Sequence, residues 1–110
     1  MPGKTGLIWD EKFLDYNFGS QHPLRPVRVK LTYELIQSKG ILQQGSIKVI
    51  KPRLASRAEI LLFHEDDYVR LVEQYSKRGS GLLDMGDTPA FEGCYEATSL
   101  VVGASIVATD

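Results

Sequence analysis

Histidine and cysteine, which often act as general bases, nucleophiles and zinc ligands, are scarce in this 110-residue sequence. The two histidines, His22 and His64, lie in different segments, and Cys94 is the only cysteine. Zinc sites that can be recognised in a sequence usually have several His, Cys or carboxylate ligands at short spacing. The sequence contains neither a His-Glu-x-x-His nor a Cys-x-x-Cys motif. We therefore expect no catalytic residue and no metal ligands among these residues.

Each of these three side chains has a structural explanation. His22 precedes Pro23 and is expected to hold its loop through a hydrogen bond. His64 is followed by three acidic residues, which favour the N-terminus of a helix because they complement its dipole. Cys94 has acidic neighbours that disfavour a reactive thiolate, so we interpret it as a core cysteine.

Asp87 is a carboxylate of a different kind, because it stands between Gly86 and Thr88-Pro89 at the end of a glycine-rich stretch. Aspartate at such a position often forms a turn or caps a helix. A carboxylate there can also accept hydrogen bonds from the backbone amides of a bound peptide. The residues themselves leave both interpretations open.

The elements that must position these residues alternate between strand and helix in the first half of the chain. A short apolar run predicts a strand over residues 5–9, and a breaker-rich, aromatic loop over 15–26 is expected to line a pocket. Apolar residues at helical spacing, with Pro26 before them and Gly40 after them, predict a helix over 27–39. Alternating residues predict a second strand over 46–50.

The second half is predicted to be helical. Ser56 and Glu59 have the spacing of a capping box, which predicts a helix ending near His64. A second helix is expected from residue 65 or 66 to Tyr75, followed by a loop over 76–87.

Residues 93–109 have almost no charged face. They predict an apolar helix, with a buried strand as the alternative because of their β-branched content. Either element must be covered on all sides, which indicates truncation or a partner. We expect self-association through this segment.

Composition limits the class of protein. With 43% hydrophobic and 25% charged residues, the chain falls within the range of one globular domain or part of one. Residues 1–55 carry nine basic and four acidic side chains, and residues 56–110 carry four and ten. This segregation suits attraction between the two halves or a basic surface for anions, but no nucleic-acid-binding pattern occurs. The lone cysteine and the absence of a signal or membrane segment favour a cytoplasmic protein.

Three motifs resemble those of the zinc-dependent deacetylases, namely the histone deacetylases and the acetoin utilization proteins. In order they are Tyr16–Thr32, which contains His22-Pro23-Leu24-Arg25-Pro26; Phe63–Val69; and Gly86–Gly93, which contains Gly86-Asp87-Thr88-Pro89. Their order and their coverage of most of the chain make the resemblance specific.

The resemblance implies an α/β fold of the arginase/deacetylase type, in which helices flank a parallel sheet. Residues 1–110 would form the N-terminal part of one such domain, with the substrate-rim loops and the early helices. Asp87 matches a rim aspartate that binds the backbone amides of an acetylated lysine peptide. Arg28 matches an arginine beside an internal channel, and Arg25 a basic position near an inositol phosphate in some relatives. A small acetylated amine is the other expected substrate.

The resemblance also implies what these residues do not supply. Family enzymes use a bound zinc ion, a histidine pair and usually a tyrosine, all of which would come after Asp110. Thr88 stands where eukaryotic members commonly have a cysteine. We therefore expect the isolated chain to be inactive and to bind no zinc.

Two other interpretations of the chain stay open. One is a non-catalytic binding or interaction module that retains the substrate rim. The other is a small anion-binding domain that uses Arg25, Arg28 and Lys30.

Overall fold

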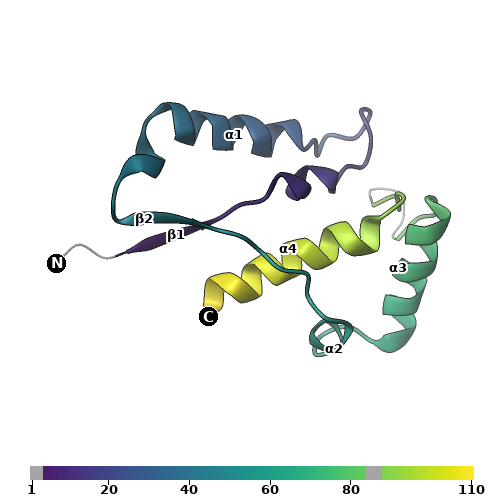
Figure 1. Ribbon diagram of the computed structural model, residues 1–110. Helices are drawn as coiled ribbons and strands as arrows, with labels where there is room; N and C mark the ends of the chain where they lie inside the picture. Colours follow the sequence, from purple (N-terminus) through teal and green to yellow (C-terminus); the bar gives the residue numbers. More distant parts are fainter. Residues whose placement is uncertain (1–3, 84–87) are drawn as a thin grey trace.

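The computed structural model describes residues 4–83 and 88–110 of the chain, and Figure 1 shows their arrangement. In chain order, the elements are β1 (Thr5–Ile8), the 3-10 helix η1 (Glu11–Asp15), α1 (Val27–Ser38), the 3-10 helix η2 (Ile41–Gln43), β2 (Ile47–Ile50), α2 (Arg57–Ile60), α3 (Asp66–Arg78) and α4 (Cys94–Thr109).

The two strands form a parallel pair in which Thr5 lies opposite Ile47 and Ile8 lies opposite Ile50. Parallel strands need a long crossover connection, and α1 lies in that connection. Figure 1 shows α1 on one side of the strand pair and α4 on the other. The predicted strands and their parallel arrangement are therefore confirmed.

Helix α1 begins at Val27, directly after Pro26, as the sequence predicts, and ends at Ser38, one residue before the predicted end. A proline before the first turn removes no hydrogen bond from the helix, because the first amides of a helix have no partners within it. Trp9 at the end of β1 stacks on Tyr33 of α1, with ring centroids 4.1 Å apart and planes 7° from parallel. This stacked pair attaches α1 to the strands.

The predicted capping box at α2 is present. The Glu59 amide donates to the Ser56 hydroxyl, and the Ser56 amide donates to the Glu59 carboxylate. The regular helix is shorter than predicted, because it ends at Ile60 and the chain reaches His64 through turns.

Helix α3 is longer than predicted and ends at Arg78, so the loop expected from Ser76 begins later. The positive charges of Lys77 and Arg78 stabilise the last turn, because they lie at the negative end of the helix dipole. Gly79 then ends the helix in the left-handed conformation, with φ of 77°. Ion pairs from Arg57 to Asp66 and Glu73, at 2.9 and 3.1 Å, hold α2 against α3.

The apolar segment at the end of the sequence is a helix, α4, and not the alternative strand. Its small residues allow the extended segment before α2 to approach closely. The Ala55 amide donates to the Ser99 carbonyl at 2.9 Å, and a Cβ added at Gly103 would overlap the carbonyl oxygen of Arg53. This backbone contact explains why a residue without a side chain stands at position 103.

The core is built from small side chains around the N-terminal half of α4. Ala90, Cys94, Ala97 and Leu100 are buried there, together with Val69 of α3. The expectation that Cys94 is a core residue is therefore confirmed. Among the described helices, none is long and apolar enough to span a membrane.

Candidate functional site

The loop between η1 and α1 is held by an aromatic cluster of Tyr16, Phe18, His22 and Phe91. Phe18 lies 4.5 Å from the His22 ring and 5.5 Å from the Phe91 ring, and Tyr16 lies 5.2 Å from Phe18 and 6.1 Å from Phe91. Most of these pairs meet edge to face, which is favourable for aromatic rings. The cluster brings the first and third sequence motifs together.

His22 also shapes the loop through its ring nitrogen. The Leu24 amide donates to Nδ1 of His22 at 3.1 Å, so this nitrogen carries no proton in that arrangement. A neutral ring then has its proton on Nε2. The predicted hydrogen-bonding role of His22 in the loop is confirmed.

Burial shapes the electrostatics of Tyr16 within the cluster. Desolvation is the main cause that raises the pKa of its phenol, and Cys94 and Tyr68 raise it further. An environment that resists ionisation of a phenol also disfavours other buried anions. The uncharged Tyr16 ring lines two separate cavities, so the aromatic loop lines a pocket as predicted.

Arg28 lines an apolar cavity of about 350 Å³ between β1 and α1. The other lining residues include Leu7, Trp9 and Tyr33. Arg28 follows the N-terminal residue of α1, and its side chain is exposed. The arrangement places a guanidinium beside an apolar pocket, where it can pair with a carboxylate.

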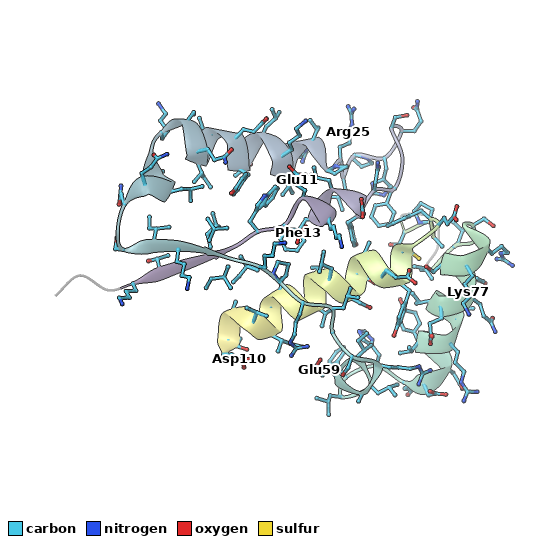
Figure 2. The ribbon with its side chains drawn as sticks, viewed as in Figure 1. Glu11, Phe13, Arg25, Glu59, Lys77 and Asp110 are labelled. Carbon is cyan, nitrogen blue, oxygen red and sulfur yellow. The ribbon has the colours of Figure 1, made fainter. Side chains whose placement is uncertain are left out.

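Arg25 lines a different groove, of about 560 Å³, between the N-terminal end of α1 and α4. Figure 2 shows Arg25 near the start of α1, with Phe13 of η1 between α1 and α4. Phe13 and Val29 line both this groove and the Arg28 cavity. The two arginines are therefore near one another in sequence but line different cavities.

Asp87, the predicted substrate-binding residue, lies outside the described residues. The chain on either side of residues 84–87 is held together. The Leu83 amide donates to the Thr88 carbonyl at 3.0 Å, and the Ala90 amide donates to the Gly81 carbonyl at 2.7 Å. The sequence did not reveal that Phe91, four residues after Asp87, packs against Phe18 across the site.

A metal site does not form from the part of the chain that the structure describes. Within residues 4–83 and 88–110, no three His, Cys, Asp or Glu side chains converge. These residues do not fit a catalytic zinc ion, so we assign no step of a hydrolytic reaction to them.

Comparisons with known proteins identify the family and the fold of the chain. Residues 22–110 match the model of the histone deacetylase domain family. The chain is 36% identical to the acetoin utilization protein AcuC of Bacillus subtilis and 29% identical to the type-1 histone deacetylase 1 of Dictyostelium discoideum. Each alignment covers 94% of this chain, but only 28% and 22% of the respective relative.

A solved structure confirms the predicted fold class. The crystal structure of the HDA15 HD domain superposes with a TM-score of 0.78 at 24% identity, covering 94% of this chain and 30% of that one. The small parallel sheet between helices is thus part of an arginase/deacetylase-type fold. Because the family model covers most of the sequence, the chain belongs to the histone deacetylase family.

Proposed function

We propose that residues 1–110 form the N-terminal, substrate-rim part of a single zinc-dependent deacetylase domain. That domain hydrolyses acetyl-lysine in peptides or a related small acetylated amine. The observation that carries the proposal is the aromatic cluster, in which Phe91 from the Asp87 motif packs against Phe18 and Tyr16 of the first loop. This contact joins two motifs that are distant in the sequence, which supports their assignment to one rim.

We assign the two roles that require contact with substrate or product to Asp87 and Arg28. Asp87 accepts hydrogen bonds from the substrate backbone and orients the acylated side chain. Arg28 pairs with the carboxylate product in the channel, and its position beside a 350 Å³ apolar cavity supports this role. Arg25 is the candidate for a second anion at the surface.

The zinc ion and the groups that transfer protons belong to the remainder of the domain. The chain spans less than a third of the length of the relatives above, which supports this division. Cys94 is a free, buried thiol, which agrees with a cytoplasmic protein.

The protein isolated from its own cells provides the test. We expect an intact mass well above 12.3 kDa and hydrolysis of an acetyl-lysine peptide. Asp87→Asn should lower kcat/KM about tenfold or more, because a hydrogen bond to a charged group is lost. Asp67→Asn, a matched change on α3, should leave it unchanged.

Two results would reject this proposal. A stable cellular product of 12.3 kDa without activity would favour the binding or interaction module instead. Tight binding of one zinc equivalent to the 110-residue chain would show that the metal ligands had been assigned to the wrong part of the domain.

A further inference from the structure

Helix α4 begins without a capping side chain of its own. Its N-cap residue is Gly93, at φ of 82°, which has no side chain to accept from the first amides of the helix. Helices usually have Ser, Thr, Asp or Asn at this position, and the side-chain oxygen binds one of the unpaired amides. The left-handed conformation selects glycine instead. Another part of the chain must therefore supply the oxygen.

Ser76, in the last turn of α3, supplies this oxygen. The Tyr95 amide, the second of α4, donates to the Ser76 hydroxyl at 3.0 Å, and this hydroxyl donates to the Glu96 carboxylate at 3.2 Å. The Gly93 amide donates to the Ser76 carbonyl, also at 3.2 Å. A capping box combines an N-cap serine with a glutamate at the third helical position. Glu96 occupies that third position, but the serine comes from a different helix.

The hydrogen bonds lie where the end of α3 meets the start of α4 (Figure 1). Ser76 is only 3% exposed, so its bonds are shielded from water. The backbones also approach closely, because a Cβ added at Gly79 would lie 3.4 Å from the Glu92 Cβ and 3.6 Å from the Glu92 nitrogen. Two separate contacts therefore attach the residues before α4 to the end of α3.

This attachment fixes the backbone that carries Phe91. The Cys94 amide donates to the Phe91 carbonyl at 3.0 Å, which connects Phe91 to the first turn of α4. The Phe91 ring in turn contacts Phe18 and Tyr16 of the first loop. The bonds of Ser76 therefore determine where Phe91 meets the first loop.

We propose that Ser76 is a positioning residue for the substrate rim. Its hydroxyl, together with the Glu96 carboxylate, holds the start of α4 and thereby places Phe91 against the first loop. The inference rests on the proposed function, because Ser76 acts on a substrate only through the rim. Loss of the hydroxyl loosens the rim, which weakens peptide binding and leaves the hydrolytic step unchanged.

Ser76→Ala, introduced into the protein that its own cells produce, tests this role with two measurements. Hydrogen–deuterium exchange of the Tyr95 amide should become about tenfold faster, because this amide loses its acceptor. With an acetyl-lysine peptide, KM should rise about three- to tenfold, while kcat should stay within about twofold. A solely structural role would lower the active fraction, and hence kcat, without raising KM.

Two further variants make the result specific. Ser80→Ala is the matched control, because Ser80 is exposed and its carbonyl, not its hydroxyl, accepts from Arg78. This control should change neither the exchange of the Tyr95 amide nor KM. In a Phe91→Ala background, Ser76→Ala should raise KM little further, because both residues act on the same contact.

The outcomes separate this inference from the proposed function. If the unsubstituted protein does not hydrolyse the peptide, or if Asp87→Asn has no effect, the proposed function itself fails. If the protein passes both tests, any of four results for Ser76→Ala would overturn the inference. These are unchanged exchange of the Tyr95 amide, an unchanged KM despite faster exchange, a lower kcat at constant KM, and an effect on KM that is fully additive with that of Phe91→Ala.

Discussion

Replacement of Gly103 by alanine tests the backbone contact on which the packing of α4 depends. An added Cβ would overlap the carbonyl oxygen of Arg53 and lie 2.7 Å from its carbonyl carbon and 2.9 Å from the Ala55 nitrogen. These are backbone atoms, so no side chain can rotate away. The segment before α2 must move off the helix, which breaks the hydrogen bond from the Ala55 amide to the Ser99 carbonyl.

The magnitude follows from three contributions to the free energy of unfolding. Overpacking costs about 1–3 kcal/mol, and loss of the buried hydrogen bond costs about 1–3 kcal/mol. Alanine recovers about 1 kcal/mol, because it is a better helix former than glycine. We therefore expect Gly103→Ala to lower the free energy of unfolding by about 3 kcal/mol.

Urea denaturation followed by circular dichroism measures this change. Gly45→Ala is the matched control, because a Cβ there has nothing within 4 Å and its φ is not positive. The control should alter stability by less than about 0.5 kcal/mol. If Gly103→Ala leaves too little folded protein to titrate, faster hydrogen exchange of the Ala55 amide in native conditions serves instead. A Gly103→Ala variant more stable than the original chain, as for an unobstructed helical glycine, would refute the reasoning.

Three further predictions concern acid stability, the aromatic cluster and association. The hydrogen bond from the Arg53 side chain is the largest cause, and the one from the Ser56 amide the second, that lowers the pKa of Glu59 from 4.5 to about 2. The ionised Glu59 therefore contributes stability above pH 4.5, and this contribution is lost as the pH falls toward 2. The stability difference between the original chain and Glu59→Gln should shrink over this range in urea titrations, and a constant difference would contradict the assignment. Phe91→Ala should cost about 2–3 kcal/mol and speed proteolysis within residues 15–26, whereas Phe63→Ala, at a residue 87% exposed, should do neither. Finally, sedimentation velocity should show self-association that grows with concentration, and a monodisperse monomer would disprove it.

Local signals in the sequence predicted most of the elements. The proline before residue 27 and the Ser56 capping box act within a few residues, so the sequence alone predicts where α1 and α2 begin. Helix α3 extends beyond Tyr75, where the sequence predicts its end because Ser76 and the basic residues after it lack the apolar pattern of the preceding turns. Ser76 is in fact buried, and its hydroxyl accepts from the Tyr95 amide at 3.0 Å.

The parts that could not be predicted depend on contacts between distant segments. The choice between helix and strand for α4 involves its packing against Arg53 and Ala55, about 50 residues earlier in the chain. The site also depends on a contact between distant segments, because no residue close to Tyr16 in the sequence indicates that Phe91 packs against it. The sequence indicated only the character of each loop by itself: an aromatic loop that lines a pocket, and a motif whose carboxylate, Asp87, is predicted to bind a substrate.

The shape of the chain supports its assignment to one layer of a larger domain. A compact domain of 110 residues has a radius of gyration of about 13 Å, whereas this chain has 16.1 Å and a shortest dimension of 19 Å. Leu31 and Leu35 on α1 are 59% and 57% exposed, although they lie one helical turn apart on the same face. Among the described residues, most of the buried side chains are small, whereas many large apolar side chains are exposed, as expected if further protein covers a thin layer. Val101 and Val102 of α4, within the segment expected to mediate self-association, are also exposed, at 42% and 39%. We propose that the rest of a deacetylase domain buries this surface of α4 as well as that of α1.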